Sequence, residues 1–267
     1  MPKKRKPASR TVWQAMNNEE SGVPLAHNAA NLAAFLSPRG ADLDKRIWTA
    51  DRGDFWLEPG LDQSNLKIEP DGAFLFESTG VSNARGIYPK ISSTDSALMV
   101  VSARPNDAGF AEGPTIISRF GGSGGPGEGT WRVRTHPAGV GDQIYDDSGN
   151  LFGDTVRTTT DTSGHHILVG ALDRATNTYN QLTWLNTNTK QHVFSASTSA
   201  LTGAISPKTK DEGSKATSSH TFVGRFYGIG LWVFPSGLPS DWEMAALTMG
   251  LAWKNGKYTF WPRWGVI

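Results

Sequence analysis

Residues Gly164 to Asn186 read GHHILVGALDRATNTYNQLTWLN, and this stretch decides the fold class. The segment from His166 to Asp173 alternates as a single β-strand does, NTY supplies a polar turn, and QLTWLN returns as the next strand. Two adjacent histidines stand at the entrance of the first strand. The stretch therefore predicts two antiparallel strands, and it raises the question whether the histidine pair is chemical or structural.

Strand-like segments recur on both sides of this stretch. LKIEPDGAFLF (66–76) alternates around the turn residues Pro70-Asp71-Gly72 and reads as a hairpin. Three more segments are short, rich in β-branched or aromatic residues and bounded by Gly or Pro: ALMVVSARP (97–105), PTIISRFG (114–121) and TWRVRTH (130–136). HTFVGRFYGIGLWVF (220–234) is the last long β segment. Because 30 glycines and 15 prolines also favour many strands joined by turns, we predict an all-β fold.

One amphipathic helix is predicted near the C-terminus, in LPSDWEMAALTMGLAWKNG (238–256). Ser240 and Glu243 have the spacing of a capping box, and Gly256 is a stop signal. Apolar residues recur between them at helical spacing: Trp242, Ala246, Met249 and Trp253. We expect this stripe to pack on the sheets.

The chain is predicted to have two parts. Residues 1–52 form a basic arm followed by an irregular docking segment, in which NAANLAAFL (Asn28 to Leu36) is the only helix candidate. Residues 53–267 form the β domain, together with the helix and an aromatic tail.

The composition limits the functional classes. The formal net charge is +1, so we expect no general attraction to nucleic acid or to a membrane surface. The absence of cysteine excludes disulfides, thiolate metal sites and a cysteine nucleophile. The first thirty residues contain no apolar core of a signal peptide, and no run approaches the roughly 20 apolar residues of a membrane span.

The order of these segments resembles the concanavalin A-like, laminin-G-like family. The resemblance rests on His165-His166-Ile167 at a strand entrance, on Tyr227-Gly228, and on the helix introduced at Leu238, with Thr187 where the family usually has glycine. It implies a two-sheet antiparallel jelly-roll sandwich with one C-terminal amphipathic helix. It also implies that the histidine pair packs or hydrogen-bonds structurally.

The motifs of the enzymes that share this fold are not matched. The nearest approach to the paired carboxylates of glycoside hydrolases is Glu69-Pro70-Asp71, whose proline and following glycine make it a turn. Fragments of a polysaccharide lyase pattern, QIY (143–145) and QHV (191–193), lack their companion residues. We therefore predict a protein that is not an enzyme and has no cofactor, with a lyase or a glycoside hydrolase as lesser alternatives.

Calcium is the one ion for which candidate ligands are present. GDQIYDDSGNLFGD (141–154) contains hard oxygen donors in a loop without EF-hand spacing: Asp142, Asp146, Asp147, Asn150 and Asp154. The alternative interpretation is a polar loop that uses Asp and Asn for its turn geometry.

Two functional hypotheses follow. As a carbohydrate-binding module, the domain would stack sugars on exposed rings, and Trp48, Trp56 and Trp131 are the candidates because Trp184, Trp232, Trp242 and Trp253 fall on inward positions.

As a bacteriophage virion protein, which is the primary prediction, the chain would decorate a capsid or join a tail and assemble in the host cytoplasm. The predicted partners are a major capsid protein or tail proteins, with self-association and a surface glycan as further options. The ending AWKNGKYTFWPRW resembles the close of laminin-G-like domains encoded by phages. The residues predicted to dock on the partner are Lys3, Lys4, Arg5, Lys6, Arg10, Trp261 and Trp264. The run Lys3-Lys4-Arg5-Lys6, called the basic tetrad, also resembles a nuclear localisation signal, which leaves a nuclear protein as an alternative.

Overall fold

The computed structural model describes residues 31–42, 47–49, 51–52, 54–59, 67–76, 82–87, 90–105, 115–121, 130–136, 139–157, 164–176, 178–197, 203–205 and 224–256. Its strands are β1 (Leu32–Leu36), β2 (Ala41–Asp42), β3 (Ile47–Thr49), β4 (Asp54–Pro59), β5 (Lys67–Ile68), β6 (Phe74–Phe76), β7 (Ser82–Ile87), β8 (Ser96–Pro105), β9 (Thr115–Gly121), β10 (Thr130–His136), β11 (Gly139–Tyr145), β12 (Leu151–Arg157), β13 (His166–Asp173), β14 (Thr178–Asn186), β15 (Gln191–Ser197) and β16 (Gly224–Phe234). A 3-10 turn, η1 (Pro38–Gly40), and the helix α3 (Trp242–Lys254) complete the described elements.

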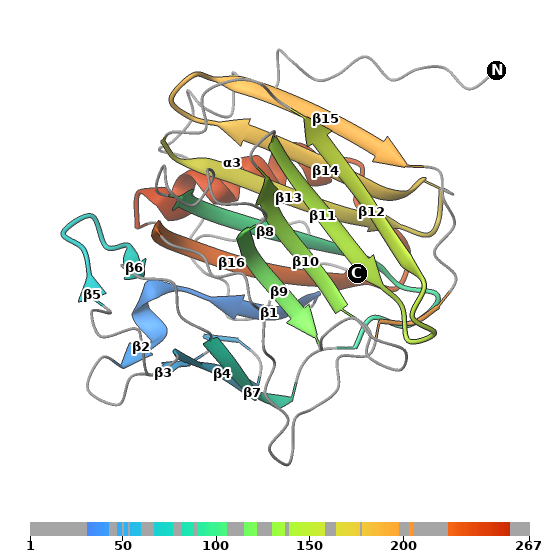
Figure 1. Cartoon of the computed structure of the whole chain (residues 1–267). Helices are drawn as coiled ribbons and strands as arrows, with labels where there is room; N and C mark the ends of the chain where they lie inside the picture. The colour runs from blue at the N-terminus through green and yellow to red at the C-terminus, as the bar shows by residue number, and fades with distance from the viewer. Residues whose placement is uncertain are drawn as a thin grey trace.

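The centre of the molecule is an eight-stranded antiparallel sheet with the order β15-β14-β13-β8-β16-β6-β5, and β1 also pairs with β16 (Figure 1). The strands predicted at 97–105, 166–173 and 220–234 are its middle members, and the hairpin predicted around Pro70-Asp71-Gly72 is β5 and β6. The all-β prediction with a single C-terminal helix is confirmed among the described residues.

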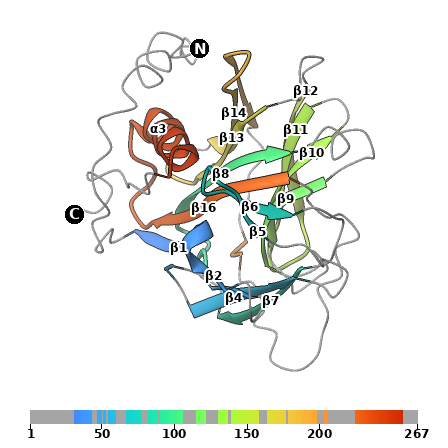
Figure 2. The same ribbon diagram turned by 90° about the vertical axis from the view of Figure 1, so that its left-hand side faces the viewer.

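A second sheet, of order β12-β11-β10-β9, covers one face of the large sheet, whereas α3 covers the other (Figure 2). Trp131 of β10 is fully buried between the two sheets. A Cβ added at Gly170 of β13 would lie only 2.9 Å from Cζ2 of Trp131, so this glycine makes room for the ring. All eight residues of β13 are buried. The second sheet covers one face of this strand and α3 covers the other, so no alternate residues are left exposed.

The helix-covered face is packed around aromatic rings. Trp253 of α3 stacks with Trp232 of β16, with ring centroids 6.2 Å apart, and contacts Phe35 of β1 at 5.1 Å. A Cβ at Gly228 would approach Trp253 to 2.7 Å. The predicted stripe of α3 therefore forms the core of this layer, as Trp242, Ala246, Met249 and Trp253 are all buried.

The helix predicted over Asn28 to Leu36 is wrong for residues 32–36. The alanine-rich segment forms strand β1, which pairs antiparallel with β16 through positions such as Phe35↔Gly230. Helix propensity is a weak preference, and burial of Leu32 and Phe35 against the helix layer outweighs it. Pairings of β1 with β16 and of β3 with β4 cross position 52, and the domain boundary there stays a prediction.

One turn differs from its prediction, and a second forms without the glycine that the resemblance leads one to expect. The turn between β13 and β14 lies at residues 174–176, before the predicted NTY, because the Asp173 carboxylate accepts hydrogen bonds from the Ala175 amide and the Thr176 hydroxyl. After β14, a turn forms without the family's glycine: the Asn186 side chain accepts from the amides of Asn188 and Thr189, and Lys190 adopts a positive φ of 61°.

The capping box predicted for α3 does not form. The N-cap is Asp241, without a side-chain cap hydrogen bond. Glu243 instead accepts from the Thr183 hydroxyl of β14 at 2.9 Å and lies 3.1 Å from Nε2 of His192 on β15. The glutamate thus ties the start of the helix to the sheet.

Candidate functional site

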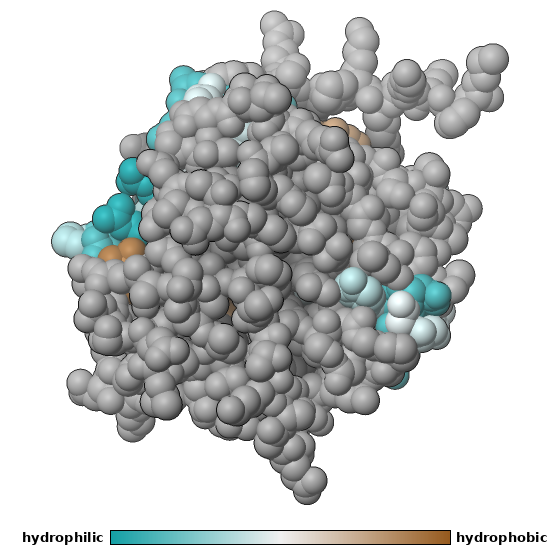
Figure 3. All heavy atoms as spheres, in the orientation of Figure 1, coloured by the Kyte–Doolittle hydropathy of each residue, from teal (hydrophilic) through white to brown (hydrophobic). Residues whose placement is uncertain are grey.

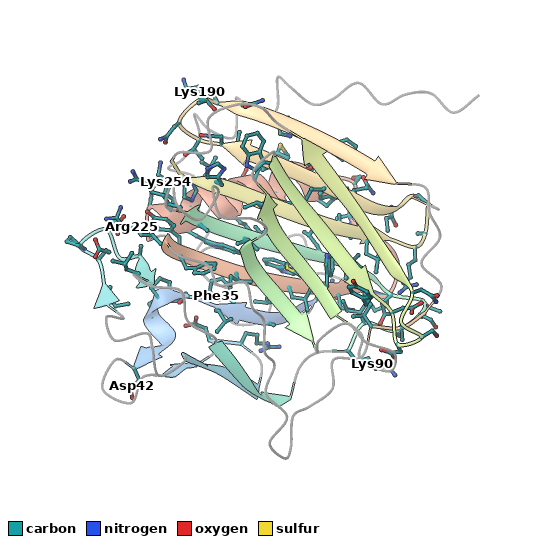
Figure 4. The ribbon with its side chains drawn as sticks, viewed as in Figure 1. Phe35, Asp42, Lys90, Lys190, Arg225 and Lys254 are labelled. Atoms are coloured by element: carbon teal, nitrogen blue, oxygen red, sulfur yellow. The ribbon has the colours of Figure 1, made fainter. Side chains whose placement is uncertain are left out.

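A group of charged side chains lies at one end of the large sheet. Arg104 of β8 and Arg225 of β16 are direct cross-strand partners. Arg104 lies two residues after Ser102 on β8, so the two side chains lie on the same face of the sheet. The Ser102 hydroxyl donates to the Gly250 carbonyl of α3, so this is the face that the helix covers. Arg225, the direct partner of Arg104, lies on the same face. Lys254, the last residue of α3, lies at this same end (Figure 4).

The turn of the β5–β6 hairpin brings two carboxylates to these cations. Nη2 of Arg225 donates to Oε2 of Glu69 at 2.9 Å, and the Tyr227 hydroxyl donates to Oδ2 of Asp71 at 3.0 Å. We call this set of six residues the polar rim: Glu69, Asp71, Arg104, Arg225, Tyr227 and Lys254. Figure 3 shows hydrophilic atoms gathered on this edge, where Figure 4 labels Arg225 and Lys254.

The two hydrogen-bond donors of the polar rim, Arg225 and Tyr227, both have raised pKa values. Burial, and after it the hydrogen bond to Asp71, raises the pKa of Tyr227 well above its usual value, so this hydroxyl stays a donor at neutral pH. The hydrogen bond to Glu69 raises the pKa of Arg225. Asp71 is held further by the Ala73 amide, which donates to its Oδ1 at 3.1 Å.

His165 lies buried directly beneath the polar rim. Its Nε2 is 2.8 Å from the Ser102 hydroxyl, and its ring meets the Tyr227 ring edge to face at 5.1 Å. Because the only proton of the Ser102 hydroxyl is donated to the Gly250 carbonyl, Nε2 of His165 is the donor in the first bond. Burial, followed by the charges of Lys254, His166 and Arg104, holds the pKa of His165 well below its usual value.

The second histidine of the pair is also structural. His166 is fully buried, its Nδ1 accepts a 2.8 Å hydrogen bond from Nε1 of Trp184, and the two rings stack at 5.6 Å. Both imidazoles therefore pack and hydrogen-bond inside the sandwich, as the sequence predicted, and Ser102 is oriented toward a helix carbonyl.

Two cations of the polar rim stand apart from the rest. Within the described ranges, neither Arg104 nor Lys254 forms a hydrogen bond or an ion pair with a side chain. Arg104 is exposed, and Lys254 is half-buried. The polar rim thus combines two hydrogen-bonded pairs with two cations that have no side-chain partner among the described residues.

The calcium candidates are divided by the fold. Asp146 is fully buried and accepts from the Ser148 and Asn150 amides and from the Asn150 side chain, each at 2.9 Å. Asp142 and Asp154 face each other in the β11–β12 ladder, and the Asp147 amide bonds to the Ala204 carbonyl. No group of three His, Asp or Glu side chains that could hold a metal occurs among the residues described. The loop uses its carboxylate at position 146 for turn geometry.

The tryptophans predicted to stack on sugars have different outcomes. Trp131 is completely buried, so the prediction that its ring is exposed is wrong; β10 turns this residue toward Gly170. Trp48 and Trp56 belong to the small sheet β2-β3-β4-β7, where Trp48 pairs with Leu57 and Trp56 with Thr49. This register places positions 48 and 56 on opposite faces of the sheet, and their part in sugar binding stays a prediction.

The predicted docking residues lie outside the described ranges: Lys3, Lys4, Arg5, Lys6, Arg10, Trp261 and Trp264. In the described part of the chain, no helix has the length and the apolar character that crossing a membrane requires.

The sequence alone does not predict the polar rim, because Glu69-Pro70-Asp71 has the pattern of a turn. A signal was present, because Arg225 interrupts an otherwise apolar strand in FVGRFYGIGLWVF. The register that sets Arg225 beside Arg104, however, joins strands more than a hundred residues apart.

Comparisons with known proteins return similarities of structure alone. No family model and no curated protein sequence matches the chain. The ligand binding domain of botulinum neurotoxin serotype D, in complex with N-acetylneuraminic acid, is similar over 90% of this chain and 52% of that one, at 10% identity and a TM-score of 0.47. The binding domain of serotype G shares 15% identity over 82% of this chain and 50% of that one, with a TM-score of 0.46.

Lectin II from Ulex europaeus is similar over 69% of this chain and 94% of the lectin, at 9% identity and a TM-score of 0.38. The chain spans about half the length of the neurotoxin domains that it matches.

Proposed function

We propose that this chain is a non-enzymatic carbohydrate-binding domain on a lectin-like β-sandwich, and that the polar rim binds the sugar. The observation that carries the proposal is the pair of oriented hydrogen bonds at the rim, Arg225 to Glu69 and Tyr227 to Asp71. They hold two carboxylates and one guanidinium beside each other at this end of the large sheet.

This arrangement suits the chemistry of a sugar. Each hydroxyl group both donates and accepts, so a sugar site needs fixed acceptors and fixed donors side by side. Because the side chains already hold one another in place, binding costs less conformational entropy. Ile68, which is 40% exposed, lies on the same hairpin as Glu69 and Asp71 and offers an apolar surface for the carbon face of a ring.

The polar groups at this end of the sheet do not favour catalysis. A glycoside hydrolase needs one carboxylic acid that donates its proton to the substrate, whereas Glu69 and Asp71 are each engaged by a donor of the protein, Arg225 and Tyr227. An acyl-transfer mechanism needs a hydroxyl whose proton is taken by histidine, whereas the Ser102 proton goes to the Gly250 carbonyl in a fully buried position. These directions of donation support binding without turnover.

The test is a glycan array probed with the full chain and with the double variant Glu69→Gln, Asp71→Asn. We expect the wild type to retain a defined set of glycans and the double variant to lose them, with melting temperatures within a few degrees. Lys90→Gln, an exposed change at the opposite end of the sandwich, is the matched control and should bind as the wild type does. An array without hits, or a double variant that binds normally, would contradict the proposal.

A bacteriophage virion role is the second candidate, and its support is the basic tetrad of the sequence and the aromatic tail. Light scattering of the chain with and without residues 1–10 tests it. We expect the shortened chain to stay folded but to lose assembly onto itself or onto a particle. Unchanged assembly would count against the arm as a docking element.

A further inference from the structure

We infer that the glycan bound at the polar rim is acidic, and that Arg104 and Lys254 hold its carboxylate or sulfate group. The inference rests on the proposed function and names the class of ligand for that same site.

The first step is the placement of Arg104 opposite Arg225. Two like charges at directly opposed positions of an antiparallel pair repel each other, so such a pair needs counter-charges. Arg225 has one, because Glu69 lies 2.9 Å from its guanidinium. Arg104 has none among the described residues, and its side chain is exposed. One of the two arginines is therefore neutralised within the fold and the other is left open.

The second step is the convergence of Lys254 on the same place. Arg104 and Lys254 come from different elements, a strand and the end of a helix. The Gly250 carbonyl, one turn before Lys254, accepts a hydrogen bond from Ser102, two residues before Arg104 on the same face of β8. Both charges also lower the pKa of the buried His165. His165 is itself neutral and donates to Ser102, so it offers no counter-charge. Two cations without a counter-charge among the described residues thus lie at the same end of the sheet, and an anion that bridges them would neutralise both.

The third step is the choice of ligand. A guanidinium matches the planar oxygens of a carboxylate or a sulfate with two parallel hydrogen bonds, and an ammonium adds a point charge. A densely charged chain such as a nucleic acid would also bring phosphates against Glu69 and Asp71 of the same rim. A sugar with a single acidic group places its anion at Arg104 and Lys254 and its hydroxyls at the carboxylates. The mixture of signs therefore favours an acidic glycan.

The experiment uses an array that prints neutral oligosaccharides beside their uronic acid and sulfated counterparts. We expect the full chain to retain acidic members in preference to their neutral counterparts. Arg104→Gln and Lys254→Gln should each weaken that binding about tenfold, the value of one charge-assisted hydrogen bond. Binding of any neutral member should stay unchanged in both variants.

The control variant is Lys90→Gln, which removes the same charge at the opposite end of the molecule (Figure 4). If it weakens acidic binding as much as Arg104→Gln does, the attraction is general and the inference is wrong. Retention of neutral glycans alone, or acidic binding that survives loss of Arg104 and Lys254, overturns the inference but leaves the sugar-binding proposal intact. An array with no hits overturns both.

Discussion

The two ends of the central strands β8, β13 and β16 handle charge in opposite ways. At the end away from the polar rim, Arg174 donates to the carbonyls of Asp95 and Gly203 at 2.9 and 2.7 Å, and Asp146 is bonded within its own turn. At the rim, Arg104 and Lys254 have no such acceptor among the described residues. The charged groups Arg174 and Asp146 are bonded within the fold and stabilise it, whereas Arg104 and Lys254 remain available to the acidic group of a ligand.

The largest effect on stability should come from Asp146→Ala, which opens the closed end. The change leaves the Ser148 and Asn150 amides without their acceptor beside a buried position, and we expect a loss of about 3 kcal/mol in the free energy of unfolding. Urea denaturation measures it. Asp146→Asn keeps the Oδ1 acceptor and should lose about 1 kcal/mol. If the alanine variant is as stable as the wild type, the hydrogen bonds of Asp146 do not stabilise the fold.

The next effect is a pH dependence that starts beneath the rim. The unfolded chain protonates His165 near pH 6.5, whereas the folded chain, in which the pKa of His165 is lower, takes up this proton only at lower pH. The contribution is therefore fully present above about pH 6.5 and is lost below it, by up to about 1.4 kcal/mol per pH unit.

Urea denaturation between pH 7.5 and 5 measures this slope. In His165→Gln, which keeps a donor toward Ser102, the slope should be smaller by that amount. An equal slope in both proteins would show that other groups cause the dependence.

A smaller effect separates the two arginines of the rim. Arg225→Gln removes a partly exposed ion pair and should cost at most about 1 kcal/mol. Arg104→Gln removes only an unpaired charge from a repulsive pair and should leave the melting temperature equal or slightly higher. If Arg104→Gln is the more damaging of the two in calorimetry, Arg104 is part of the closed structure.

The smallest effect concerns the helix that joins the two ends. Because Ser240 makes no capping hydrogen bond, Ser240→Ala should change the free energy of unfolding by less than about 0.3 kcal/mol, where a true cap would lose about 1 kcal/mol. Chemical denaturation distinguishes these values. A loss near 1 kcal/mol would show that Ser240 caps the helix after all.

The sequence predicted those parts of the fold that depend on local pattern. Alternation and turn residues placed the hairpin at Pro70-Asp71-Gly72 and the strands at 97–105 and 166–173, and the helical spacing of Trp242 and Trp253 predicted the buried face of α3. The failures depend on partners far along the chain. Residues 32–36 are a strand because β16 pairs with them, and Glu243 leaves the capping position because Thr183 and His192 bind it.

The candidate site was harder to predict for the same reason. Trp131 lies in a strand that also carries Arg132 and Arg134, and no local pattern shows that β13 covers the face of this strand on which Trp131 lies. The polar rim needs the register between β8 and β16 and the reach of the hairpin turn to Tyr227. A charged residue inside an apolar strand is the local sign, and its partners appear only when the sheet is assembled.

The place of β16 in the large sheet has a consequence for synthesis on the ribosome. It is the last strand that the structure describes, yet it lies between β8 on one side and β6 with β1 on the other. Until residues 224–234 emerge, β8 keeps an open edge and β1 lacks its partner strand. We expect nascent chains that end before residue 224 to depend on chaperones and to aggregate when released early.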